Sequence, residues 1–154
     1  MKNARVYINS TDYTAEQRWG IIFSGEALTA LMTPAGKKEY IKNESPLMDG
    51  EEILSVGDYT PKTAARDVQL MIGLRARSFG QFLTNYRSFV SELEKGTFDI
   101  TVHAWEGNDW FRETYHLNYV SCSQYSEFNG RLAKFVLKLR EPNPKNREFE
   151  SNII

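Results

Sequence analysis

The chain has 154 residues, of which 41% are hydrophobic and 25% are charged, with a formal net charge of -1 at pH 7. This composition is typical of a globular protein with a sizeable core and argues against wholesale disorder. A net charge near zero gives no overall attraction to nucleic acid or to an anionic membrane, and a single cysteine, Cys122, leaves no intrachain disulfide.

The first third of the chain shows only short apolar segments. Its start lacks the apolar stretch of a secretory signal, and we expect no membrane span anywhere. Residues 5–9, 20–23 and 27–32 each have the length and composition of a short strand. Residues 33–66 then form a long connection rich in Gly, Pro, Lys, Glu and Asp. Connections of this length are usually functional or disordered, and the apolar residues within this one favour a functional loop.

The clearest element is an amphipathic helix over about residues 78–95. Apolar residues recur there every three or four positions, on one helical face: Phe79, Phe82, Leu83, Tyr86, Phe89, Val90 and Leu93. Ser78 is placed to cap the first turn, and Gly96 suits a left-handed exit from the last. The polar face carries no pair of carboxylates or histidines, so we interpret the helix as a brace packed on a sheet.

Strands flank this helix on both sides. Residues 68–74 and 98–104 alternate apolar and polar side chains, which indicates strands with one buried face. After a polar turn, residues 110–121 form the returning strand of a hairpin, and Asn129-Gly130 predicts a second hairpin with residues 131–140. A meander of three strands therefore follows the helix. We expect an α+β fold, a mostly antiparallel β-sheet or sandwich with one helix packed on it.

The last hairpin contains a conflict of register. Strict pairing across Asn129-Gly130 sets Leu137 opposite Cys122 and Leu139 opposite Val120, which turns the apolar face of the last strand away from that of Tyr119. A β-bulge near residues 121–123, or a longer turn, restores one continuous apolar face. We expect one of the two.

The last strand ends at Pro142 and Pro144, because proline cannot donate to a β-ladder. The residues that follow are polar and charged. We therefore expect one domain over residues 1–144 and a flexible tail over residues 145–154.

The sequence holds no phosphate-binding loop, nucleophile elbow or Cys/His metal ribbon, so the search for chemistry comes down to two histidines. If the first hairpin closes simply, His116 lies near Asp99 and His103 near Arg112, on the polar face of the sheet. This is either an acid-base or metal cluster or a set of solvated polar pairs, and the lack of a third ligand favours the second. Cys122 lies too far along its strand from His116 to be activated by it. We expect no catalytic residue, no metal, no cofactor and no enzyme activity.

Charge is distributed unevenly along the chain. Residues 44–58 contain five acidic side chains and no Lys or Arg, whereas residues 131–147 contain six basic side chains and one acid, Glu141. These are either two solvated faces or two complementary patches of a head-to-tail contact that closes copies into a ring. The candidate interface residues are Tyr40, Ile41, Leu47, Met48, Glu51, Glu52, Lys134, Lys138 and Arg140.

Several short motifs occur in a suggestive order: Trp19-Gly20-Ile21, Leu-Thr-Ala-Leu-Met-Thr-Pro at residues 28–34, Asp49-Gly50, Arg-Asp-Val-Gln-Leu at 66–70 and Glu-Pro-Asn-Pro-Lys-Asn-Arg at 141–147. With the order of strand, long loop, Arg-Asp strand, helix and meander, the chain resembles tailed-phage or prophage tail structural proteins, and in particular the N-terminal domain of distal tail (baseplate hub) proteins.

The resemblance implies a sheet-and-helix unit of the tail-tube type that packs into a ring, such as a hexamer, with the long loop reaching a neighbouring copy. The protein would be made in the bacterial cytoplasm and reside in the virion tail, and its partners would be itself and other tail proteins. No nucleic acid, membrane or small-molecule substrate is implied. Distal tail proteins commonly carry a second, C-terminal domain that supports host-binding parts, and this sequence ends soon after Arg147.

An alternative from another class is a monomeric β-rich module that uses the aromatic-rich sheet to bind a small ligand or a carbohydrate. Trp19, Trp105 and Trp110 would then be stacking platforms. Their alternate spacing with Phe and Tyr residues favours packing in the core or at turns instead.

Overall fold

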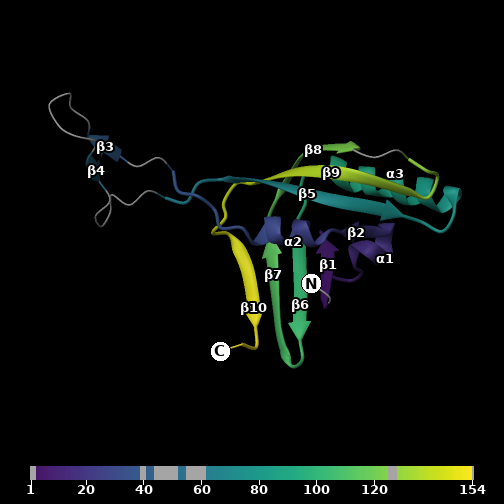
Figure 1. Ribbon diagram of the computed structural model, residues 1–154, viewed down its shortest axis with the longest axis horizontal. Coiled ribbons are helices and arrows are strands. Elements are labelled where there is room, and N and C mark those ends of the chain that lie inside the picture. The colour runs from purple at the N-terminus through teal and green to yellow at the C-terminus, as the bar shows by residue number, and fades with distance from the viewer. Residues whose placement is uncertain (1–2, 39–40, 44–51, 55–61, 125–127, 154) are drawn as a thin grey trace.

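The computed structural model describes residues 3–38, 41–43, 52–54, 62–124 and 128–153 (Figure 1). Its elements in chain order are β1 (Ala4–Ile8), α1 (Ala15–Trp19), β2 (Ile21–Phe23), α2 (Gly25–Met32), β3 (Ile41–Asn43), β4 (Glu52–Leu54), β5 (Arg66–Arg75), α3 (Phe79–Glu94), β6 (Ile100–Glu106), β7 (Asp109–Tyr115), β8 (Asn118–Gln124), β9 (Leu132–Glu141) and β10 (Arg147–Ser151).

The strands form two four-stranded sheets and one small pair. Sheet A has the order β1-β6-β7-β10, sheet B has the order β2-β5-β9-β8, and β3 pairs with β4. Every strand pair within the described residues is antiparallel. The predicted class, α+β with a mostly antiparallel sheet, is confirmed.

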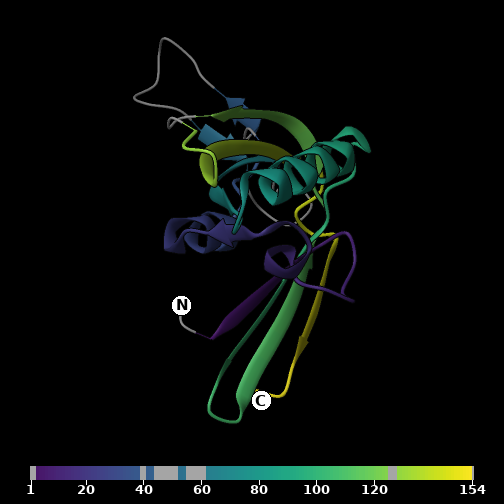
Figure 2. The same ribbon diagram turned by 90° about the vertical axis from the view of Figure 1, so that its right-hand side faces the viewer.

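One hydrophobic core joins both sheets and the helices. Figure 2 shows α2 and α3 on the same side of sheet B, with sheet A extending away from that layer. Buried side chains of the three helices and of both sheets belong to a single cluster, which includes Trp19, Leu31, Leu70, Phe89 and Ile100. Each sheet thus buries one face and leaves the other open.

Helix α3 is the predicted amphipathic helix, with bounds close to those expected. The Ser78 hydroxyl accepts a hydrogen bond from the Gln81 backbone N–H at 3.2 Å, which caps the first turn. Phe82, Phe89 and Leu93 are buried. The expectation of one helix is wrong, because α1 and α2 are helices too.

Residues 27–32 lie in α2, so the strand expected there is wrong. The Ser24 hydroxyl accepts from the Ala27 N–H at 3.2 Å and starts a helix. Ala27, Leu28 and Leu31 are then buried on one side of it, at the spacing of a helix and not of a strand. The strands expected at residues 5–9 and 20–23 are confirmed as β1 and β2.

The first hairpin is confirmed, but its returning strand is shorter than predicted. β6 and β7 pair around a turn that contains Gly107, whose φ is 60°. The strand expected over residues 110–121 breaks after Tyr115, and β8 begins at Asn118 in the other sheet. Leu117 lies buried at the crossing, where its carbonyl accepts from the Phe98 N–H at 2.9 Å. The three-strand meander is therefore divided between both sheets.

The last hairpin contains the expected bulge. Cys122 pairs with Leu137, whereas Tyr119 pairs with Leu139, so Val120 is an extra residue in β8. Val120 is exposed, and Tyr119 and Cys122 both pack against the core. The bulge lies one residue before the predicted range and restores one apolar face, as expected.

The expected flexible tail is wrong for residues 147–151, which form β10 beside β7. The Ser151 hydroxyl donates to the Trp110 carbonyl at 3.1 Å, and the Arg147 guanidinium bonds Glu141. These contacts order a segment whose sequence pattern is weakly apolar. Among the helices that the structure describes, none is long and apolar enough to cross a membrane.

Candidate functional site

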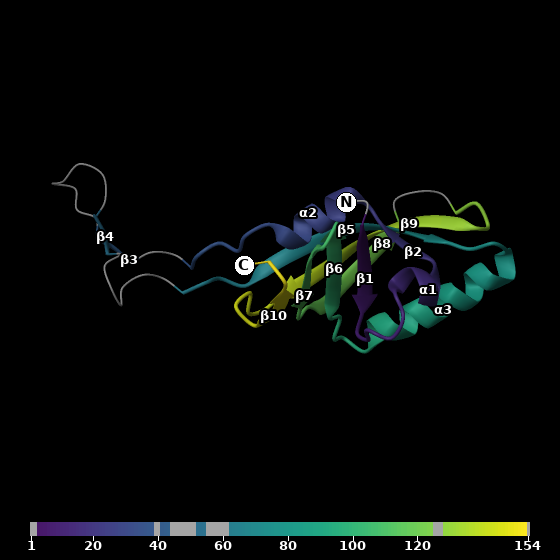
Figure 3. The same cartoon turned by 90° about the horizontal axis from the view of Figure 1, so that it is seen from below.

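The long connection over residues 33–66, called the arm below, leaves the body as a paired segment. The Lys38 N–H donates to the Lys62 carbonyl at 2.9 Å, and the Ala64 N–H donates to the Gly36 carbonyl at 2.9 Å. Further out, β3 and β4 pair with each other. Figures 1 and 3 both show β3 and β4 lying apart from the two large sheets. The described parts of the arm therefore project from the body.

Arg66 fixes the base of the arm. Its Nη1 donates to the Thr33 carbonyl at 2.6 Å and to the Ala30 carbonyl at 3.2 Å, and its Nε donates to Glu141 Oε1 at 2.7 Å. Thr33 and Arg66 are the two ends of the arm, so a single guanidinium joins them. The direction in which the arm leaves is thereby tied to the end of α2 and to sheet B.

Glu141 is the centre of this cluster and is 0% exposed. Arg147 Nε donates to its Oε2 at 2.8 Å, and Arg147 Nη2 donates to its Oε1 at 2.8 Å. Burial by itself raises the pKa of Glu141, but hydrogen bonds and charge from Arg147 and Arg66 outweigh burial and hold the pKa below its usual value. A charged, paired Glu141 thus connects β5, β9 and β10.

Three of the predicted interface residues lie together on β9. Lys134, Lys138 and Arg140 alternate with buried residues, and all three are exposed on the open face of sheet B. Arg140 Nη1 lies 2.6 Å from Asp67 Oδ1, a pair exposed enough to add about 1 kcal/mol or less. Across the strands Lys138 pairs with Gln69 of β5 and Ser121 of β8.

The same open face also carries apolar side chains. Met71 of β5 pairs with Val136 of β9, and both are half-buried. Ile22 of β2 and the bulged Val120 of β8 are exposed. The open face of sheet B therefore carries lysines and partly exposed apolar side chains side by side.

The other predicted interface residues belong to the arm. Ile41 pairs with Leu54 at the start of β3, and Glu52 pairs with Asn43 at the start of β4. Tyr40, Leu47, Met48 and Glu51 lie outside the described residues. The structure therefore brings the three β9 residues onto one face, whereas Ile41 and Glu52, the described arm residues among the predicted set, lie in the separate β3–β4 pair.

The two histidine pairs predicted from the hairpin are present. His103 pairs with Arg112, and His116 Nδ1 lies 3.3 Å from Asp99 Oδ2. Within the described ranges, no three His, Cys, Asp or Glu residues are grouped so that they could hold a metal ion. Burial raises the pKa of Cys122 to about 11, so at neutral pH this residue is a packed thiol.

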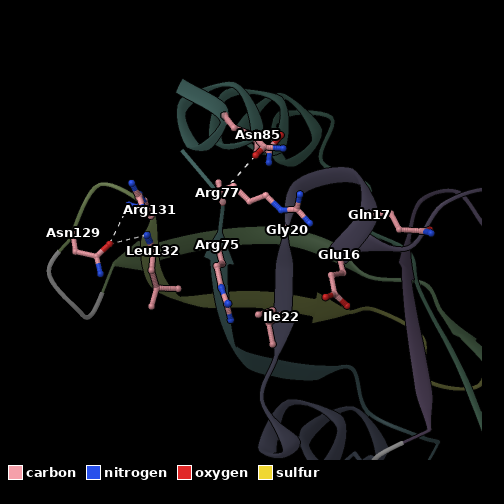
Figure 4. A pocket seen from close by; sticks show the side chains of 12 residues that line it. Glu16, Gln17, Gly20, Ile22, Arg75, Arg77, Asn85, Asn129, Arg131 and Leu132 are labelled. Carbon is pink, nitrogen blue, oxygen red and sulfur yellow. Dashed lines mark hydrogen bonds between the residues drawn. The ribbon is translucent and has the colours of Figure 1, made fainter. Parts of the chain in front are cut away.

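Several cavities border the sheets in the described part of the chain, and two of them bear on a candidate site that was not predicted. The larger, about 1170 Å³, is an open groove between α1, the end of β5, the start of α3 and the start of β9 (Figure 4). Arg75, Arg77 and Arg131 line it together with Glu16 and Asn85. Its width and openness make it a surface depression and not an enclosed site.

The smaller cavity, about 660 Å³, lies beside the β6–β7 turn. Trp105 and Trp110 line it with Arg5, His103 and Arg112. Trp19 is in the core, as its spacing favoured, but Trp105 and Trp110 are half-buried at this open pocket. The available signal was their position on either side of the predicted turn, in alternation with His103 and Arg112.

No family model matches the chain, and no curated protein matches its sequence. At the level of fold, the chain is similar to a phage hub protein. The crystal structure of SPP1 Dit, described as a paradigm of the hub adsorption apparatus in phages that infect Gram-positive bacteria, superposes with a TM-score of 0.57 at 12% identity. The match covers 92% of this chain and 50% of that chain, so this sequence spans about half the length of SPP1 Dit.

Proposed function

We propose that the protein is a non-enzymatic structural subunit of a phage or prophage tail, at the distal tail, the baseplate or the tube, and that it assembles into a ring. The observation that carries this proposal is the similarity of fold to SPP1 Dit over 92% of the chain. Its partners are further copies of itself and other tail proteins. The family resemblance implies a ring such as a hexamer. It is located in the virion tail, where its role is structural and consists in shaping the assembly.

A closed ring of identical copies needs two different surfaces on each copy that fit one another. The projecting arm and the open face of sheet B are two such surfaces. The arm sequence holds Glu44, Asp49, Glu51, Glu52 and Asp58 within residues 44–58, without Lys or Arg. The open face presents Lys134 and Lys138, both exposed. Opposite charge on the two surfaces would orient the encounter between copies.

Besides opposite charges, the arm and the open face of sheet B both carry apolar residues that could pack together. The arm carries Tyr40, Ile41, Leu47 and Met48. The open face carries the half-buried pair Met71 and Val136 beside the lysines. Burial of such side chains between copies would provide most of the binding free energy, because exposed charge pairs contribute little.

The proposal is tested by charge exchange. Glu51→Lys with Glu52→Lys should lower the ring fraction measured by native mass spectrometry and sedimentation, most strongly at low salt. Lys134→Glu with Lys138→Glu should do the same, and the four changes together should restore part of the ring. A matched control, Asp12→Lys with Glu94→Lys, alters two exposed acids elsewhere and should leave the ring unchanged.

Two outcomes would contradict the proposal. A wild-type chain that stays a monomer at high concentration supports the alternative of a monomeric binding module. Rings that persist at low salt in the Glu51→Lys, Glu52→Lys variant show that the arm does not make the contact.

A further inference from the structure

A row of polar residues crosses the open face of sheet A. Arg5 of β1 pairs with His103 of β6, His103 pairs with Arg112 of β7, and Arg112 pairs with Glu150 of β10. Directly paired residues on neighbouring strands point to the same side of a sheet. Four strands from distant parts of the sequence therefore assemble one polar row.

Two tryptophans extend this row toward the hairpin turn. Trp105 and Trp110 pair with each other, and their rings lie 5.5 Å and 5.7 Å from the His103 ring, both edge to face. The Arg5 guanidinium carbon lies 5.2 Å from the centre of the Trp105 ring. Together with Gly107 and Asn108 of the turn, these residues line the open 660 Å³ pocket. That volume is within the range of sites for small ligands, about 300–1,000 Å³.

Arg112, which lines the pocket, has one hydrogen-bond donor that the described residues leave unused. Arg112 Nε is buried and has no hydrogen-bond partner within the described part of the chain. A buried N–H without an acceptor costs about 1–3 kcal/mol, and native structures contain few of them. The Arg112 side chain is therefore incompletely paired within the described residues.

Charge in the pocket favours an anion. Arg5 and Arg112 contribute two positive charges against the single carboxylate of Glu150. Burial, followed by the charges of Arg112 and Arg5, lowers the pKa of His103, so its imidazole is neutral near pH 7. A neutral imidazole both donates and accepts hydrogen bonds.

We propose that this pocket binds a saccharide that carries an anionic group, a carboxylate or a phosphate. The indole faces of Trp105 and Trp110 offer apolar surfaces on which a pyranose ring can lie. The Arg112 guanidinium forms a bidentate ion pair with the anionic group. His103, Asn108 and Glu150 bond the hydroxyl groups. This site is independent of ring assembly, which uses sheet B and the arm.

The test is a titration of the full chain with tetragalacturonate and, as a matched neutral probe, its methyl ester. Trp19 is 1% exposed, so a saturable change in tryptophan fluorescence reports on Trp105 and Trp110. We expect the acid to bind at least about tenfold more tightly than the ester, since a charged hydrogen bond is worth about 1.5–3 kcal/mol. Calorimetry gives the same comparison without fluorescence.

Variants assign the binding to the pocket. Trp105→Ala and Trp110→Ala should abolish it, Arg112→Gln should remove the preference for the acid, and Arg112→Lys should retain part of that preference. Tyr13→Ala, which removes an exposed aromatic ring outside the pocket, should bind like the wild type. Thermal unfolding of each variant separates loss of binding from loss of folding.

The proposal is overturned by equal affinity for the acid and its ester, by binding that survives both tryptophan variants, or by no saturable change with either probe. Inorganic phosphate that competes as well as tetragalacturonate would show an anion site without sugar recognition. Loss of rings in the tryptophan variants, with no sugar binding by the wild type, would assign the pocket to a contact between copies.

Discussion

Gly20 ends α1 and leads into β2 with a backbone that few residues can adopt. Its φ is 71°, in the left-handed region, and its N–H donates to the Glu16 carbonyl at 2.9 Å. A Cβ atom at this position would lie 2.1 Å from the Arg75 carbonyl oxygen of β5. Both the backbone angle and the close approach of β5 therefore require glycine.

We predict that Gly20→Ala destabilises the protein by at least about 3 kcal/mol, measured by urea unfolding, because the left-handed angle alone costs about 1–2 kcal/mol and the backbone contact adds to it. Gly96→Ala is the matched control. Gly96 has a φ of 83° but open space around its Cβ position, so only the angular cost applies. Equal losses in the two variants would show that β5 does not constrain Gly20.

Residue spacing predicted part of the candidate site and missed the rest. Lys134, Lys138 and Arg140 were predicted from the basic charge of the last strand, and alternation along β9 puts them on one exposed face. The pocket of Trp105 and Trp110 was missed because two of its lining residues, Arg5 and Glu150, come from β1 and β10. A strand pattern says which residues share a face but not which distant strands lie beside them.

At the scale of elements, α3 supplies the largest aromatic contacts of the core. Phe89 lies 5.6 Å from the Trp19 ring of α1 and 6.3 Å from the Phe98 ring that precedes β6, between ring centres. It is 2% exposed. This one side chain connects α3 with both the first helix and the approach to sheet A.

We predict that Phe89→Ala lowers the free energy of unfolding by about 3–5 kcal/mol, through lost burial and the cavity left behind. Leu83→Ala on the same helix is the control, and its loss should be much smaller because Leu83 is 37% exposed. Molecules of the Phe89 variant that remain folded should assemble as the wild type does. A folded, stable variant with impaired assembly would instead place α3 at a contact between copies.

The apolar periodicity and the Ser78 cap predicted α3. Apolar alternation around a polar turn predicted the first hairpin, and the register conflict predicted the bulge. Each of these features lies within the segment that it predicts. Helix α1 is too short for periodicity, although Thr14 and Gln17 form a reciprocal cap at its start. In α2, apolar residues on most positions fit a buried strand as well as a helix. β10 has little apolar pattern. It is ordered by pairing with β7 and by the ion pair between Arg147 and Glu141, and local sequence reveals neither.

For the whole molecule, Glu141 joins the two sheets and the base of the arm. Its carboxylate receives Arg66 from β5 and Arg147 from β10. Because the folded state holds the pKa of Glu141 below its value in the unfolded chain, this group stabilises the fold above the unfolded pKa. That stabilisation is lost as the pH falls through the lower, folded pKa.

We predict that urea unfolding from pH 7 to pH 3 will show a loss of stability in acid that is smaller in Glu141→Gln than in the wild type. At pH 7 the variant should be less stable by about 3–5 kcal/mol, because the buried guanidinium of Arg66 and the half-buried guanidinium of Arg147 lose their counter-charge. Glu94→Gln, at an exposed position of α3, should keep the wild-type profile. The same acid dependence in Glu141→Gln and wild type would assign the acid sensitivity to other carboxylates.

The order of strands in sheet A also bears on how the protein is made. The outer strands of this sheet, β1 and β10, come from opposite ends of the described chain, so every strand of sheet B is translated before sheet A is complete. Until β10 arrives, β7 presents unpaired N–H and C=O groups to which a second nascent chain could add. β10 covers that edge with a strand that carries Arg147, Glu148 and Glu150. Nascent chains can therefore join edge to edge only until β10 is made and pairs with β7.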